Sequence, residues 1–108
     1  MMEDQDNTIQ ALLILIANPK LEEMLVDFLL QQSDLSGFTS MPVSGHGGGH
    51  DTTKLSLVEQ VSGRQRRVQF MLHAALPVLR ELIAALKAEF MHADMHYMLL
   101  PVLEAQSL

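Results

Sequence analysis

The stretch Gln-Ala-Leu-Leu-Ile-Leu-Ile-Ala-Asn-Pro, residues 10–19, contains the longest apolar run of the chain. A half-buried strand alternates apolar and polar residues, so this continuous run predicts a strand over residues 10–17 that is buried on both faces. Asn18-Pro19 ends the strand and starts a helix, because asparagine caps free helical N–H groups and proline suits the first helical position. That helix is expected to end near Gln32. Its apolar stripe consists of Leu21, Met24, Leu25, Phe28 and Leu29.

Three further strands and a second helix are predicted after this point. The strands cover Phe38–Val43, Arg64–His73 and Met95–Val102, and the second helix begins at Pro77. A weaker alternation over 54–61 could extend a hairpin. In the third strand, Val68, Phe70 and Leu72 share one face. The apolar stripe of the second helix consists of Leu76, Leu79, Ile83, Leu86 and Phe90.

The order β-α-β-β-α-β predicts an α+β fold, a ferredoxin-like sandwich with an antiparallel sheet and both helices on one face. Right-handed crossovers place the first and third strands in the centre of this sheet. Pro42 and Pro101 agree with this arrangement, because both fall on predicted edge strands, where a missing backbone N–H is tolerated.

The sheet face without helices is the feature that predicts self-association. The first strand is apolar on both sides, so this face would expose a large apolar patch, and such patches mark interaction surfaces. A chain of 108 residues also has little core to spare. We therefore expect an obligate oligomer with its sheets facing inward. The alternative is a stable monomer whose second face is only partly apolar.

Composition excludes several classes of protein. The chain has no cysteine, which rules out disulfides, thiolate zinc sites and a cysteine nucleophile. The formal net charge of −6 argues against a nucleic-acid partner. Ala11–Ala17 is too short to span a membrane, and the anionic start does not resemble a signal peptide. We expect a cytoplasmic protein without membrane insertion. Residues 1–9 form a disordered acidic tail in this interpretation, and residues 10–108 form the domain.

A glycine-rich segment, expected to be a flexible loop over about residues 45–56, carries the sharpest candidate site. It contains His46-Gly-Gly-Gly-His50. Neutral imidazole binds zinc, copper and nickel, and the glycines would let both rings reach one ion. Glu59 or Asp51 could add a carboxylate oxygen. The alternative is a mobile loop with two solvated histidines, since two ligands do not close a tetrahedral site.

Other potentially functional groups give weaker signals. Met91-His92 and Met95-His96, with Met98 nearby, combine thioether and imidazole, but neighbours along a strand point apart, and we expect the methionines mainly to fill gaps in the core. His73 ends a strand and is expected to be exposed or satisfied.

Arg64, Arg66 and Arg67 form the main basic concentration and could bind an anionic effector or an acidic partner. A solvated strand face is the simpler interpretation of these arginines. No recognisable nucleophile elbow or phosphate loop supports catalysis, so we do not expect an enzyme.

The chain resembles the PII-like proteins, the superfamily that includes PII and CutA, over about residues 10–104. The resemblance is carried by Gly37-Phe38-Thr39, by Gly45 at the start of the loop, by Val58-Glu59-Gln60-Val61 and by Leu100-Pro101-Val102. The histidine pair followed by residues 59–64 resembles an uncharacterised subfamily associated with heavy-metal efflux. This resemblance implies a homotrimeric signalling module.

The chain departs from the PII pattern at its nucleotide site. PII proteins hold ATP phosphates with a Gly-x-Gly-Lys turn before the last strand, where this chain has His92-Ala93-Asp94-Met95. No arginine follows Arg80, the loop has no tyrosine, and residues 45–50 have no glutamine. The resemblance therefore implies fold and trimer, without the residues that bind nucleotide in PII.

These observations lead to a regulatory binding protein as the expected function. The loop would sense a transition-metal ion or dock on a heavy-metal efflux membrane protein through His46, His50 and Glu59. One alternative is a nucleotide sensor that binds in the clefts between subunits with Arg64, Arg66 and Arg67. Another is an adaptor that responds to no ligand.

Overall fold

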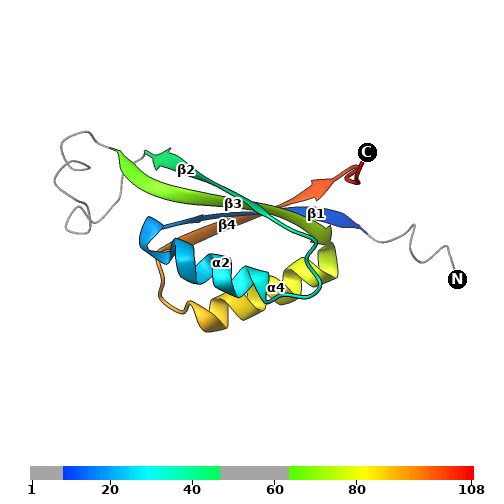
Figure 1. The fold of residues 1–108 in the computed structure, drawn as a ribbon, viewed down its shortest axis with the longest axis horizontal. Helices are drawn as coiled ribbons and strands as arrows, with labels where there is room; N and C mark the ends of the chain where they lie inside the picture. The colour runs from blue at the N-terminus through cyan, green and yellow to red at the C-terminus, as the bar shows by residue number, and fades with distance from the viewer. Residues whose placement is uncertain (1–8, 47–63) are drawn as a thin grey trace, which may run out of the picture.

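The computed structural model describes residues 9–46 and 64–108. Four strands form one antiparallel sheet in the order β2-β3-β1-β4. Both helices lie on one face of this sheet (Figure 1). This is the predicted α+β ferredoxin-like fold. The elements are β1 (Gln10–Ala17), the 3-10 turn η1 (Pro19–Leu21), α2 (Glu22–Leu30), β2 (Thr39–Gly45), β3 (Gln65–Ala75), α4 (Leu76–Glu89) and β4 (Met95–Val102).

The strand order confirms the placement of the two strand prolines. The central strands β1 and β3 pair on both sides, whereas β2 and β4 each pair on one side. Pro42 lies on β2 and Pro101 on β4. An edge strand has one row of backbone groups outside the ladder, so a residue without an N–H is tolerated there.

The first helix begins as the Asn-Pro pair predicts. The Asn18 side chain accepts a hydrogen bond from the backbone N–H of Lys20 at 3.0 Å, and Pro19 opens the 3-10 turn. The α-helix proper starts at Glu22 and ends at Leu30, with Gln31 as its C-cap. The expected end near Gln32 was therefore about two residues too late.

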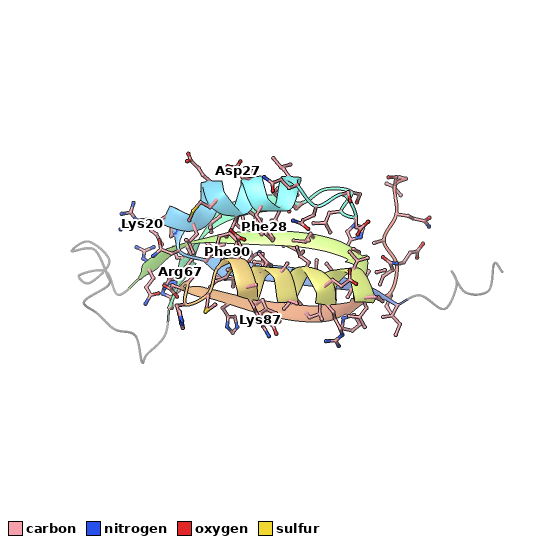
Figure 2. The ribbon with its side chains drawn as sticks, turned by 90° about the horizontal axis from the view of Figure 1, so that it is seen from below. Lys20, Asp27, Phe28, Arg67, Lys87 and Phe90 are labelled. Atoms are coloured by element: carbon pink, nitrogen blue, oxygen red, sulfur yellow. The ribbon has the colours of Figure 1, made fainter. Side chains whose placement is uncertain are left out.

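The core lies between the helices and the helix-facing side of the two central strands. The first helix contributes Leu25 and Leu29, while the predicted stripe residue Met24 is 53% exposed, so that part of the stripe was wrong. Phe28 and Phe90 join the helices edge to face, with ring centroids 5.6 Å apart (Figure 2). The strands contribute Ala11, Leu13, Leu15, Ala17, Val68, Phe70 and Leu72, and α4 contributes Leu79, Leu82, Ile83 and Leu86.

The open face, defined here as the side of the sheet away from the helices, is largely apolar. Directly paired residues share a face, so the register assigns Ile14, Met71 and Met98 to one row across this side. Met98 is 41% exposed. Along β1 the odd-numbered residues are buried and the even-numbered ones half-buried. The open face also includes Met41, Val43, Leu12, Ile16, Leu100 and Val102.

The methionines do not fill the core, contrary to the expectation from their number. None of the methionines in the described parts of the chain belongs to the buried cluster, which consists of leucine, alanine, valine, phenylalanine and isoleucine. Met41, Met71 and Met98 instead lie on the open face. Flexible, polarisable thioethers suit an adaptable contact surface better than a tightly specified core.

Two predictions fall outside the described residues. The acidic tail and most of the glycine-rich segment, with the suggested hairpin extension over 54–61, lie in residues 1–8 and 47–63. Within the described ranges, neither helix is long and apolar enough to cross a membrane.

Candidate functional site

The candidate site is the corner of the sheet where β2 ends and β3 begins. Gly45, the last residue of β2, pairs with Gln65, the first residue of β3. His46 follows β2 directly and is exposed, and Arg64 precedes β3 and is also exposed. Antiparallel pairing therefore holds both ends of the segment between β2 and β3 at one corner.

The structure describes only part of the predicted metal site. His46 lies at the corner, whereas His50, Asp51 and Glu59 lie outside the described residues. The described ranges, which omit 47–63, contain no group of three or more His, Asp or Glu residues placed to hold a metal ion. The site formed by His46, His50 and Glu59 stays a prediction.

Strand alternation divides the predicted arginine group. Arg66 opposes Ser44 on the helix side of the sheet, whereas Arg67 opposes Val43 on the open face. Arg64 lies just outside the strand. The structure thus places Arg66 and Arg67 on opposite faces of β3.

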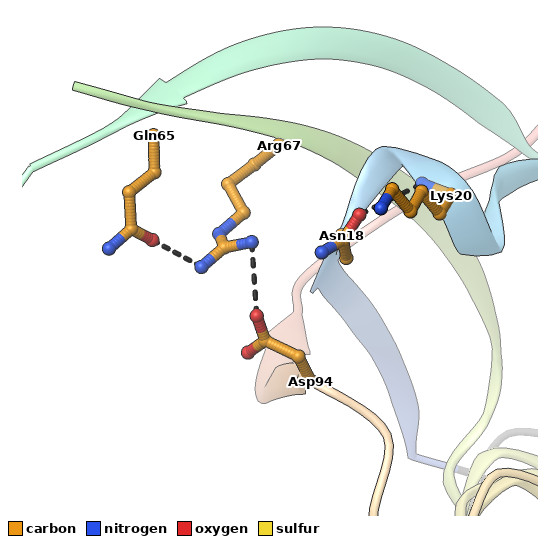
Figure 3. Close-up of polar contacts among 5 residues, drawn as sticks. All are labelled: Asn18, Lys20, Gln65, Arg67 and Asp94. Carbon is orange, nitrogen blue, oxygen red and sulfur yellow. Dashed lines mark hydrogen bonds and ion pairs between the residues drawn. The ribbon is translucent and has the colours of Figure 1, made fainter. Parts of the chain in front are cut away.

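Arg67 takes part in a polar network across the end of the sheet (Figure 3). Its Nη1 lies 3.1 Å from Oδ2 of Asp94, and its Nη2 donates to the side-chain oxygen of Gln65. Gln65 is 5% exposed, so this bond satisfies a buried amide. The backbone N–H of Asn18 donates to the backbone oxygen of Asp94 at 3.2 Å. The network joins the end of β1 to the starts of β3 and β4.

This network is the feature that sequence reasoning missed. Asp94 was interpreted only as part of a turn, and no spacing rule links it to Arg67, which lies 27 positions earlier. The strand order explains why Arg67 and Asp94 meet, because the starts of β3 and β4 both lie beside the end of β1. The side chain of Arg67 is 17% exposed and already faces a carboxylate. Its geometry thus suits holding the corner together.

The second cluster of thioether and imidazole groups divides between the two faces, as strand alternation predicts. Met95 pairs with Ala17 on the helix side, and His96 pairs with Ile16 on the open face. Met91 and His92 lie on the turn after α4 and are exposed. Met91, His92 and Met95 line one pocket on the helix side, whereas His96 lies on the other face of the sheet.

The antiparallel sheet and the two helices on one of its faces define the chain as an α+β protein of the ferredoxin-like class. Within that class, the chain belongs to the family described as "Protein of unknown function (DUF3240)", which matches residues 7–108.

Three solved structures illustrate the likeness. A DUF3240 family protein from Shewanella baltica aligns with a TM-score of 0.74 and 22% identity, over 92% of this chain and 96% of that one. A candidate PII-like signalling protein from Thermus thermophilus aligns with a TM-score of 0.61 and 19% identity, over 88% and 87%.

The third is the periplasmic divalent cation tolerance protein CutA from Archaeoglobus fulgidus. It aligns with a TM-score of 0.65 and 10% identity, over 90% of this chain and 87% of that one. At these identities the likeness establishes the fold. No curated protein matches the sequence.

Proposed function

We propose that this chain is a regulatory binding protein that assembles as a homotrimer and binds a transition-metal ion through the segment between β2 and β3. The metal ligands are His46, His50 and Glu59. Binding would change the surface that this segment presents to a partner, and the proposed partner is a heavy-metal efflux membrane protein.

The observation that carries this proposal is the antiparallel pairing of Gly45 with Gln65. Both ends of the segment are held at one corner, with His46 exposed at its start, so a ligand that binds the segment acts against a fixed base. The CutA protein is described as a divalent cation tolerance protein, which supports metal chemistry on this fold.

The open face supports the trimer. It carries three methionines and two leucines beside the polar residues Arg67, Gln69 and His96, and it lies opposite the helices. Association through this face would shelter it from water while leaving the sheet corners at the periphery. A trimer would also bring up to three copies of the histidine pair into one particle, and ligands from neighbouring subunits could complete a shell that one chain leaves open.

The alternative function is a nucleotide sensor that would bind phosphate through the arginines. The contacts that Arg67 already makes argue against this alternative. A phosphate would have to compete with Asp94, only 3.1 Å away, and with Gln65 for that guanidinium. Stabilisation against heat by adenine nucleotides would favour this alternative.

Calorimetric titration with zinc, copper and nickel tests the metal proposal. The parent protein should bind at least one of these ions saturably, and the double variant His46→Ala/His50→Ala should lose that binding. His92→Asn is the matched control, because His92 is exposed and asparagine tolerates its left-handed backbone. Equal binding by the double variant and the parent would overturn the metal site.

A further inference from the structure

A pocket on the helix side of the sheet lies between the C-terminal half of α4 and the start of β4. Its volume is about 240 Å³. Leu15 from β1 and Met95 from β4 line it, and Ile83, Leu86 and Phe90 contribute from α4 and its C-terminal end. These five side chains make an apolar lining, which is typical of small-molecule sites.

Two polar side chains lie at this pocket. Lys87 and Tyr97 both line it, and the Lys87 ammonium lies 5.5 Å from the centre of the Tyr97 ring (Figure 2 labels Lys87). Lys87 forms no ion pair with any carboxylate in the described ranges. The residues one helical turn away, Ile83 and Met91, are apolar and offer no counter-charge. The pocket therefore combines an apolar body with an exposed cation at its rim.

The turn between α4 and β4 forms one edge of the pocket. Among the residues that the structure describes, one residue other than glycine has a positive φ, and it lies in this turn. His92 has a φ of 66°, in the left-handed region that favours glycine or asparagine. It lines the pocket together with Ala93. Backbone conformations of this kind are sparsely populated by non-glycine residues and are often found at functional sites. The backbone at this edge of the pocket therefore adopts a conformation that residues other than glycine and asparagine rarely take.

We propose that this pocket binds a small amphipathic carboxylate, with its apolar part among Leu15, Leu86 and Phe90 and its carboxylate beside Lys87. The argument rests on charge complementarity: the chain as a whole carries −6, yet the one Asp, Glu, Lys or Arg side chain that lines this pocket is the cation Lys87. The volume of about 240 Å³ lies below the range of about 300–1,000 Å³ that is typical of drug-sized ligands, which indicates a small ligand. Hexanoate has this size.

This site is separate from the segment proposed to bind metal. Its lining comes from β1, α4, the following turn and β4, and it includes none of His46, His50 or Glu59. Loss of metal binding in the histidine variant would leave the pocket untouched. Either proposal can therefore fail alone.

Tyr97 provides a direct probe, because the chain has one tyrosine and no tryptophan. We expect titration with hexanoate to change the tyrosine emission saturably, with hexanol and hexylammonium binding several-fold more weakly. Saturation-transfer NMR on the hexanoate methyl group gives a second measurement that does not depend on tyrosine. Absence of a saturable response by both methods would overturn the proposal, as would hexylammonium binding as tightly as hexanoate.

Two variants and a matched control locate the binding. Lys87→Gln should weaken hexanoate binding about three- to tenfold while leaving hexanol unchanged, because only the carboxylate contact is lost. Ala93→Leu should fill the pocket and reduce binding of both ligands, with far-UV circular dichroism to confirm folding. Lys20→Gln changes an exposed lysine at the start of the first helix and should have no effect. Equal hexanoate affinity in Lys87→Gln and the parent would overturn the carboxylate contact.

Discussion

Arg67 is a single residue whose role is indicated by its contacts in the folded chain and not by its residue type alone. In the sequence it belongs to a group of three arginines that could bind an anion. In the structure its guanidinium contacts Asp94 and Gln65 across the end of the sheet. An arginine that is 17% exposed and paired with a carboxylate is better suited to fixing strand ends than to capturing a ligand.

A double-mutant cycle on this pair measures its contribution to stability. We expect Arg67→Gln and Asp94→Asn to show a coupling free energy of about 0.5–1 kcal/mol, modest because Asp94 is 54% exposed and water screens the pair. The free energies of unfolding come from urea titrations of the parent, both single variants and the double variant. A coupling energy indistinguishable from zero would show that the pair does not hold the corner.

At the scale of elements, the two helices show how far an apolar pattern predicts burial. In α4, the predicted residues Leu79, Ile83 and Leu86 are all buried. In α2, Leu25 and Leu29 are buried, but Met24 points away from the core. The spacing of an apolar stripe predicts its direction, whereas the burial of each residue depends on how the helix packs: Phe28 packs against the core, and Met24 is 53% exposed.

A pair of substitutions on α2 tests this difference. Leu25→Ala should lower the free energy of unfolding by about 2–5 kcal/mol, because it removes a fully buried side chain and leaves a cavity. Met24→Ala, one position earlier, should change it by less than about 0.5 kcal/mol, because Met24 is 53% exposed. Both values come from chemical denaturation. Similar losses in the two variants would place Met24 in a contact that the single chain does not show.

At the scale of the whole molecule, the two faces of the sheet have different environments. The helices cover one face, while the open face leaves Met41, Met98 and Leu100 at least 40% exposed (Figure 1). Scattered apolar side chains on a surface are ordinary, but these belong to one contiguous sheet face, which is the pattern of an interaction surface. Self-association through this face follows as the proposed assembly.

Light scattering after gel filtration tests the assembly. The parent should have the mass of three chains. Met98→Glu should shift it towards the single-chain mass of 12.0 kDa, because an unpaired carboxylate buried at an interface is strongly unfavourable. Met24→Glu makes the same exchange on the outer surface of α2 and should keep the parent mass. A parent protein that is folded and of single-chain mass at micromolar concentration would contradict the trimer.

The order of the elements and the direction of the apolar faces could be predicted from the sequence. A continuous aliphatic run predicts a strand, although the structure buries only one face of β1 and leaves the other half-buried. An Asn-Pro pair ends that strand and starts a helix, and a proline marks a strand as an edge. These signals are local, because they arise from backbone geometry and from the alternation of side chains within a few residues. For the same reason the sequence identified the candidate histidines and the glycines between them.

Contacts between residues far apart in the chain became visible in the folded structure. The contact between Arg67 and Asp94, the pocket between α4 and β4, and the placement of the methionines outside the core all depend on strand order and helix packing. Aliphatic side chains and Phe70 form the buried cluster, while Met41, Met71 and Met98 lie on the open face and Met95 packs against the edge of the core. These contacts depend on how all side chains pack together. The spacing of residues along the chain does not contain that information.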